Sequence, residues 1–226
     1  MTRNWVYTND INARVPMIII GTGPLAEIAY EYFKQEGRFS PIAFTAEEKY
    51  LREKWIFDLP VVPFEYIEEV YDPKYHVFYA AIAYGKMSDI RTRLYLEAKD
   101  KGYPPVTYLS PHAFYGPKSS IGEHCFIFED NTIQPFAKIG NNVILWSGNH
   151  IGHHSEIGNN CFIASHAVVS GNVKIGNNCF IGVNATIVND IEIGNYVFIG
   201  AGVIVTDNVT DGTRLTVKTE SFLKGI

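Results

Sequence analysis

The chain has 226 residues, enough for one large domain or two modest ones. It carries 24 acidic and 19 basic residues, a net charge of −5, which argues against nonspecific nucleic-acid binding. Residues 1–14 are polar, and no window approaches the ~20 apolar residues of a membrane span. We therefore expect a cytoplasmic protein without a membrane anchor.

The first half of the chain alternates strand and helix patterns. After an irregular lead-in over residues 1–14, the apolar run 15–20 predicts a buried parallel strand. A helix is predicted over 25–36, with apolar residues at helical spacing and Gly37 as its end. Further strands are expected at 40–44, 61–62, 76–83 and 106–109, and a second helix at 88–101. This order predicts a small Rossmann-like parallel sheet over residues 1–108, with residues 109–226 as a second domain.

The turn Gly21-Thr22-Gly23 joins the first strand to the first helix. Bare backbone at a helix N-terminus favours a phosphate group. A dinucleotide site would need a third glycine, where Ala26 stands, and an acid after the second strand, where Thr45 stands. We expect a nucleotide or nucleotide-sugar diphosphate here, with Gly21, Thr22, Gly23 and Thr45 as candidate contacts and a purely structural turn as the alternative.

A second part of that site is expected where the strand 76–83 ends. Ligands of open parallel sheets bind beyond the carboxyl ends of the strands. Ala83, Tyr84 and Lys86 are therefore candidates to line the same crevice as Gly21. The alternative is an ordinary exposed loop.

The second half is a hexapeptide repeat. An aliphatic or aromatic residue stands at every sixth position from Leu109 to Val205, which gives 17 blocks over residues 109–210. The second place is often glycine, and the fifth is small or β-branched. Such a beat predicts a parallel β-helix of 18-residue triangular coils, with first-place side chains inside. Cys125, Cys161 and Cys179 occupy fifth places and are expected to be buried thiols, since they form no disulfide or metal motif.

Four of the seven histidines lie between His150 and His166. Residues 18 apart should stack, so His153 should lie between Pro135 and Gly171, at a corner open to solvent or to a subunit groove. His154 should lie between Phe136 and Asn172. A histidine suits the proton removal that acyl transfer requires. The Gly171 N–H, one coil on, would serve as the oxyanion donor.

Together these features resemble the sialic-acid O-acetyltransferase and nucleotide-aminosugar N-acetyltransferase family. The resemblance runs from about Pro16 to Thr210 and rests mostly on Ile151-Gly152-His153 and on 170–176. It implies a left-handed β-helix, acetyl-CoA as cosubstrate and a homotrimer that holds it between neighbouring β-helices, in bacterial surface-glycan synthesis. It places the catalytic base on His153, the acyl contact on Gly171, acetyl-CoA contacts near Val183, Ala201 and Gly202, and nucleotide-sugar contacts on Gly21–Gly23 and Ala83-Tyr84.

The chain departs from that family at several positions. Relatives often place an acid beside the base, where this chain has His154; Glu156 or Asp130 could substitute. Some have a histidine at acetyl-CoA where this chain has Phe162. The tail 215–226 lacks a Gly-x-Pro-Ala-Lys ending, which leaves Lys218 a weak phosphate candidate.

The leading hypothesis is an acetyl-CoA-dependent N-acetyltransferase of a nucleotide-linked amino sugar, with His153 or His154 as base and no metal. The close alternative is O-acetylation of a sugar hydroxyl. A metal lyase of the carbonic-anhydrase type, holding Zn²⁺ through three histidines from two subunits, is a second class, with His150, His153, His154 and His166 as the candidate ligands. A non-catalytic nucleotide-sugar-binding scaffold is a third.

Overall fold

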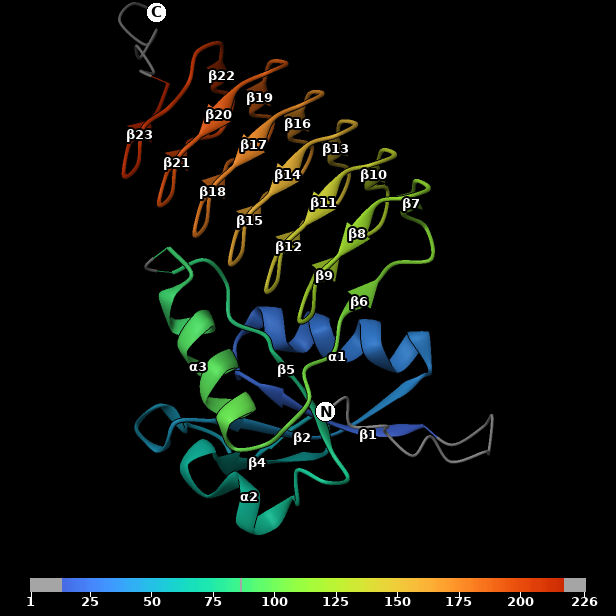
Figure 1. Ribbon diagram of the computed structural model, residues 1–226. Helices are drawn as coiled ribbons and strands as arrows, with labels where there is room; N and C mark the ends of the chain where they lie inside the picture. Colours follow the sequence, from blue (N-terminus) through green and yellow to red (C-terminus); the bar gives the residue numbers. More distant parts are fainter. Residues whose placement is uncertain (1–13, 86, 218–226) are drawn as a thin grey trace, which may run out of the picture. The chain divides into compact units, whose positions relative to one another are not determined.

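The structure is a computed structural model that describes residues 14–85 and 87–217 (Figure 1). The chain forms two compact units. One comprises the chain up to Ile82 together with Leu96–Pro105, and the other comprises Ala83–Tyr95 together with the chain from Val106. The division at residue 108 into separately folding domains stays a prediction. Among the described residues, no helix is long and apolar enough to cross a membrane.

The first unit is built on a five-stranded sheet in the order β3-β4-β2-β1-β5. Its elements are β1 Val15–Ile20, α1 Pro24–Glu36, β2 Phe39–Ala46, a 3-10 turn Glu48–Tyr50, β3 Trp55–Ile56, β4 Leu59–Pro63, a 3-10 turn Phe64–Tyr66, α2 Ile67–Val70 and β5 Val77–Ala80. All strands are parallel except β3, which runs antiparallel to β4. The predicted α/β class is confirmed.

Two features of this unit differ from the sequence-based expectation. The strand predicted over 76–83 ends at Ala80, because its neighbour β1 ends at Ile20, whose carbonyl accepts the Ala81 N–H at 2.7 Å. The β3–β4 hairpin was missed. Its turn places Phe57 and Asp58 at positive φ, and the Phe57 ring stacks on Tyr30 with centroids 4.8 Å apart.

The second unit is a triangular coil with three parallel sheets as its faces (Figure 1). Face 1 consists of β6 Tyr108–Leu109, β9 Phe126–Ile127, β12 Ile144–Leu145, β15 Phe162–Ile163, β18 Phe180–Ile181, β21 Phe198–Ile199 and β23 Arg214–Leu215. Face 2 consists of β7 Phe114–Tyr115, β10 Thr132–Ile133, β13 His150–Ile151, β16 Val168–Val169, β19 Thr186–Ile187 and β22 Ile204–Val205. Face 3 consists of β8 Ser120–Ile121, β11 Lys138–Ile139, β14 Glu156–Ile157, β17 Lys174–Ile175 and β20 Glu192–Ile193.

The hexapeptide repeat determines this architecture. Each predicted block from 109 to 210 supplies one strand, and its first-place residue is the second residue of that strand. From Ile127 to Val205 these side chains are buried in one core with the fifth-place residues, including all three free cysteines. Leu109 and Tyr115 are exposed, since they belong to the first coil, which has no coil before it to stack on. The last coil is two residues short: the Glu192 N–H meets Asn208, 16 residues on, where earlier coils advance by 18.

The corners are tight because the fourth residue of each block from Lys118 to Gly202 adopts the left-handed conformation. His154 (φ 59°), His166 (φ 58°) and Asn172 (φ 57°) are examples. Asparagine and glycine tolerate this region best and fill many of these places. The corner turns therefore present their third- and fourth-place side chains outward, as predicted for the histidines.

A helix also packs on the coil. The N-terminal part of α3 Asp89–Asp100 belongs to the second unit. From it Arg91, fully buried, donates to Asn142 Oδ1 at 3.0 Å and to the carbonyls of Asn142, Asn160 and Cys161 at 3.1–3.3 Å. Tyr95 donates to a Glu123 carboxylate oxygen. Because burial disfavours the phenolate and Glu123 accepts its proton, the pKa of Tyr95 lies well above its usual value.

Candidate active site

His153 lies at the corner between faces 2 and 3, in the turn between β13 and β14, and is exposed. Its backbone N–H donates to Gln134 Oε1 at 2.8 Å, which holds the turn to the preceding coil. The side chain lies over the next coil. A methyl group on Gly171 would meet the His153 ring at 2.7 Å from Cε1 and 2.8 Å from Nε2. The stacking of His153 on Gly171 is confirmed, and the glycine is what gives the imidazole its room.

The role predicted for the Gly171 N–H does not hold in this structure. That N–H donates to Asn189 Oδ1 at 2.9 Å, so it is not free to receive an oxyanion. The cause is the same 18-residue stacking: Asn189 follows Gly171 in the column and its amide oxygen reaches back along the coil. Gly171 itself is buried, and its contact with an acyl group stays a prediction.

His154 lies directly against His153. The two Nδ1 atoms are 3.2 Å apart and the rings are nearly perpendicular. The His154 ring also stacks on Phe136 of the preceding coil, with centroids 4.6 Å apart and an interplanar angle of 18°. Asn172, next along, donates to Asp190 Oδ1 at 3.1 Å. The predicted column of Phe136, His154 and Asn172 is therefore present.

Neither acid considered as a partner for the base takes that place. Glu156 projects from β14 and forms an ion pair with Lys138 at 2.7 Å. Asp130 lies at the corner between faces 1 and 2, where its N–H donates to the His112 carbonyl. The nearest polar ring atom to His153 Nδ1 is that of its sequence neighbour.

His166 and His150 lie apart from the His153–His154 pair. His166 lies at the face 1–2 corner over Gly148, while His150 lies half-buried in strand β13 of face 2. Across the described part of the chain, no group of three His, Cys, Asp or Glu side chains is arranged to hold a metal ion within one chain.

The residues expected at acetyl-CoA also lie at the face 1–2 corner. Val183 and Ala201 stand 18 residues apart in its third-place column, with Gly202 in the next place, and all three are exposed. They do not share a corner with His153 and Gly171.

In the first unit, the turn after β1 has the form expected of a ligand loop. Gly21 has φ 121° and packs so closely that a methyl group on it would lie 2.8 Å from the Ala81 carbonyl oxygen. Thr22 is partly exposed, and Gly23 is the exposed N-cap of α1, which has no side-chain cap. Thr45 is a correction: it is fully buried and its hydroxyl donates to the Val62 carbonyl at 2.8 Å, so it ties β2 to β4 and does not face a ligand.

Tyr84 lies on an aromatic row of the coil. Its ring centroid is 4.2 Å from that of Phe180 and 5.3 Å from that of Phe162, and its side chain stays partly exposed. Ala83 beside it is exposed. Lys86, also predicted at the nucleotide site, lies outside the described residues, as do residues 1–13 and Lys218.

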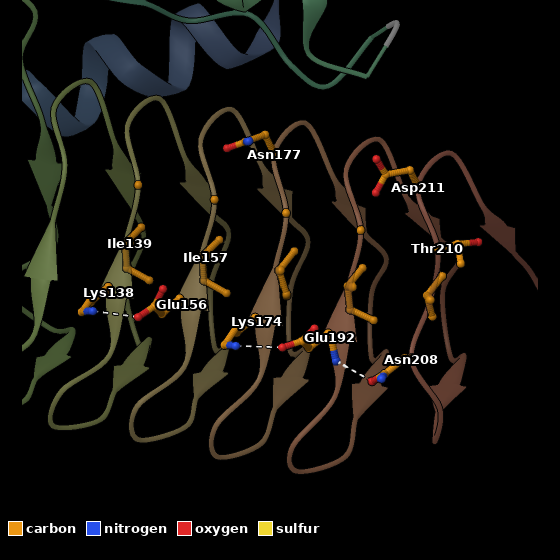
Figure 2. Close-up of a pocket in the computed structure, with 17 residues that line it drawn as sticks. Lys138, Ile139, Glu156, Ile157, Lys174, Asn177, Glu192, Asn208, Thr210 and Asp211 are labelled. Atoms are coloured by element: carbon orange, nitrogen blue, oxygen red, sulfur yellow. Dashed lines mark hydrogen bonds and ion pairs between the residues drawn. The ribbon is translucent and has the colours of Figure 1, made fainter.

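A shallow groove of about 830 Å³ runs along face 3 (Figure 2). Figure 2 shows Lys138, Glu156, Lys174 and Glu192 in line along it. Lys138 forms an ion pair with Glu156 and Lys174 one with Glu192, with an N–O distance of 2.7 Å in each pair. Hydrogen bonding to Lys174 lowers the pKa of Glu192. None of the predicted site residues lines this groove, so we do not place the reaction there.

Two residues of this geometry were not singled out from the sequence: Gln134 and Arg91. Gln134 stands 19 residues before His153, so the 18-residue column spacing that located Gly171 could have found it within one place. For Arg91, an ordinary helix position, the sequence holds no such signal.

A coil of hexapeptide blocks with an exposed histidine pair on one corner defines a hexapeptide-repeat β-helix protein. Residues 118–153, 136–171 and 172–207 match the family described as bacterial transferase hexapeptide (six repeats). No curated protein matches the sequence.

Solved structures share the fold over nearly the whole chain. The acetyltransferase domain of PglB from Neisseria gonorrhoeae FA1090 is similar at a TM-score of 0.80 and 21% identity, covering 89% of this chain and 96% of that one. PerB from Caulobacter crescentus, in complex with CoA and GDP-perosamine, has a TM-score of 0.79 and 23% identity, with 89% of this chain and 94% of that chain covered. WeeI from Acinetobacter baumannii AYE has a TM-score of 0.77 and 21% identity, with 88% of this chain and 94% of that chain covered. The predicted left-handed β-helix with an N-terminal α/β part, and the resemblance to this group, are confirmed in repeat and fold.

Proposed function

We propose that the chain is an acetyl-CoA-dependent N-acetyltransferase that acts on the amino group of a nucleotide-linked sugar. The observation that carries the proposal is the exposed His153 imidazole, which lies over the buried Gly171 at a corner of a hexapeptide coil, in the space that a side chain at residue 171 would fill. Its support from other proteins is the shared fold: one PglB structure holds acetyl coenzyme A, and PerB holds CoA and GDP-perosamine.

The chemistry asks one thing of His153. Bound acetyl-CoA would supply a thioester carbonyl as electrophile. As the sugar amine forms its C–N bond to that carbon, His153 Nε2 takes the proton that the nitrogen loses. When the C–S bond breaks, the same nitrogen returns the proton to the departing sulfur. Since the Gly171 N–H is engaged, the geometry assigns it no part in holding the oxyanion.

The two corners bear on the predicted trimer. His153 and Gly171 lie at the face 2–3 corner, whereas Val183, Ala201 and Gly202 lie at the face 1–2 corner. A cosubstrate that contacts both sets would have to span one face of a single coil or lie between two coils. We propose the second arrangement, a homotrimer in which one chain contributes the base and its neighbour the face 1–2 corner.

For the phosphates of the nucleotide sugar we propose the start of α1 at Gly21 to Gly23, which has no side-chain cap. Ala83 and Tyr84 stay predicted contacts of the same substrate, as does Lys86, which lies outside the described residues. We also propose a cytoplasmic location, since three free cysteines fit a reducing compartment, and a role in surface-glycan synthesis.

The decisive experiment incubates the purified protein with acetyl-CoA and a panel of nucleotide-linked amino sugars. Released CoA thiol is followed, and mass spectrometry identifies an acetylated sugar. The buried cysteines should give a thiol reagent little background. His153→Asn, which keeps a polar side chain at the corner, should lose activity by roughly 10²-fold or more. Matched hydroxy sugars test O-acetylation; turnover of these and not of amino sugars would move the assignment to the alternative.

The remaining alternatives make their own predictions. A binding scaffold would bind the nucleotide sugar without acetyl-CoA turnover in the same assay. A metal lyase would draw its histidines from two subunits, and metal analysis of the purified protein tests that directly.

A further inference from the structure

We infer that His154 is the positioning residue of the proposed reaction, accepting a hydrogen bond from His153 Nδ1–H in the place where related sites are expected to carry an acid. The inference deepens the proposed function and rests on it. Its basis is a contact between two exposed imidazoles at the coil corner, with Nδ1 atoms 3.2 Å apart.

The His154 ring is held firmly enough to orient its neighbour. Its backbone is at φ 59°, fixed by the corner turn, and its N–H donates to the Pro135 carbonyl. The face of its ring stacks on Phe136, and Lys118 Nζ lies over the Phe136 ring, 5.5 Å from the ring centroid. The His153 backbone is tied separately, through Gln134. Two imidazoles anchored on different partners therefore meet edge to face.

One proton between the two Nδ1 atoms decides the roles. If His154 donated, neutral His153 would carry its own proton on Nε2 and could not act as a base there. If His153 donates, its Nε2 carries no proton and can act as the base, and His154 holds its own proton on Nε2. When His153 takes up a proton, its Nδ1–H still points at the His154 lone pair. The acceptor thus serves both states of the base.

A neutral acceptor differs from a carboxylate in one testable respect. A carboxylate accepts at any pH at which it is ionised, whereas His154 accepts only while it is uncharged. Protonating it would place N–H against N–H and break the pair. The active form therefore requires both imidazoles to be neutral, so two protons must leave.

The charged groups around the pair are few. Lys118 lies two coils before His154, over the Phe136 ring, and Asp190 lies two coils after it, where it accepts from Asn172. Glu156, on the strand that follows, is engaged with Lys138. None of these contacts lies between the two imidazoles, which leaves His154 as the group that decides the orientation of His153.

Three substitutions separate orientation from packing. His154→Phe keeps a ring on Phe136 and removes the acceptor; Phe136 itself shows that a phenylalanine is accepted at this corner with φ 66°. His154→Asn keeps an acceptor at the same distance from Cα, in a residue that this coil uses repeatedly at φ near 57°. His154→Asp supplies an ionised acceptor. We expect His154→Phe to lower kcat by at least ~10-fold, with KM for acetyl-CoA unchanged, and His154→Asn and His154→Asp to retain most of kcat.

The pH profile gives the second readout. On the acid side, log kcat of the native protein should fall with a slope approaching about 2, and that of His154→Asn with a slope of about 1. Equal slopes, or a His154→Phe protein with native kcat, would overturn the inference.

A measurement without substrate separates this inference from the proposed function. Ring ¹⁵N chemical shifts of His153 should report the Nδ1–H form in the native protein and a mixture of tautomers in His154→Phe. If no nucleotide sugar is acetylated while the shifts behave so, the function is wrong and the pair stands. If turnover is found and the His153 tautomer is the same in both proteins, the pair is wrong and the function stands.

Discussion

The His153 imidazole occupies the space that a side chain on Gly171 would need: a methyl group there would come within 2.8 Å of Nε2. Real Cβ atoms do not approach other atoms this closely, so one of the two would have to move. Because the coil backbone at Gly171 is held by Asn189 and by the coils on either side, we expect the imidazole to yield.

The first prediction is therefore that Gly171→Ala displaces the base. The exposed His153 ring can swing outward at little cost in stability, but its Nε2 then leaves the position over residue 171. We expect kcat to fall by roughly 10²-fold while the melting temperature changes by no more than a few degrees. Steady-state kinetics and thermal unfolding measure both. A protein with native kcat would show that the ring position does not matter.

His166 provides the second prediction, as a control that the structure itself offers. Like His153 it is an exposed corner histidine over a glycine, in this case Gly148, but it lies at a different corner. His166→Asn suits the left-handed backbone, since asparagine tolerates positive φ. Because this corner is the one proposed to bind acetyl-CoA, a loss in His166→Asn should fall on KM for acetyl-CoA. We expect its kcat at saturating acetyl-CoA to stay within about threefold of the native value, against the ~10²-fold loss of kcat in His153→Asn. Equal losses of kcat would mean that neither corner can be singled out as the place of the base.

The repeat made most of the coil predictable, because a side chain 18 residues away is a neighbour whatever else the chain does. That arithmetic placed His153 on Gly171 and His154 on Phe136 before any coordinates. It did not tell which backbone donors were already in use: the Asn189 amide oxygen that occupies the Gly171 N–H could have turned to solvent. The predicted oxyanion donor failed at this point, where side-chain rotamers decide.

The first unit was less predictable for a different reason. Its short strands carry no repeat, and their lengths depend on where their neighbours stop, as β5 stops with β1. Thr45 was expected at the ligand because it ends the second strand in sequence. Its hydroxyl instead donates to the Val62 carbonyl of β4, a strand that the sequence predicted only as the two valines at 61–62.

Arg91 gives the third prediction, which concerns stability. Its guanidinium is fully buried and supplies hydrogen to the carbonyls of Asn142, Asn160 and Cys161. Arg91→Met keeps the apolar stem and leaves those carbonyls without this donor, which should cost about 2–4 kcal/mol. Arg93→Met, two residues on and exposed, should cost less than about 1 kcal/mol. Urea unfolding of the two variants compares them, and equal losses would contradict the anchoring role of Arg91.

The fourth prediction concerns Tyr84, which lies over Phe180 and Phe162 with its outer face open. If it stacks on a bound nucleotide sugar, Tyr84→Ala should raise KM for that substrate by about 10-fold, with little change in kcat or in KM for acetyl-CoA. Tyr84→Phe keeps the ring and should stay near the native KM. A native KM in Tyr84→Ala would remove this residue from the substrate site.

The fifth prediction follows from the buried thiol of Cys125. Burial raises its pKa to about 12, whereas an unfolded thiol ionises near pH ~8.5. As pH rises between these values, the unfolded chain gives up a proton that the folded chain keeps, so the free energy of unfolding must decrease. Each pH unit in this window costs about 1.4 kcal/mol for a fully buried thiol. Tyr95 and Tyr103, whose pKa values are also raised, contribute a decline of their own in the same alkaline range.

Comparison with Cys125→Ala isolates the thiol, because alanine is already used at the same place of the repeat, as at Ala137 and Ala167, and both proteins keep the two tyrosines. Urea unfolding of the two proteins at intervals from pH 8 to pH 11 should therefore show the native protein losing stability more steeply. The difference should appear above pH ~9 and grow with pH. Parallel curves would mean that Cys125 ionises in the folded chain as readily as in the unfolded one, which its complete burial in the coil core argues against.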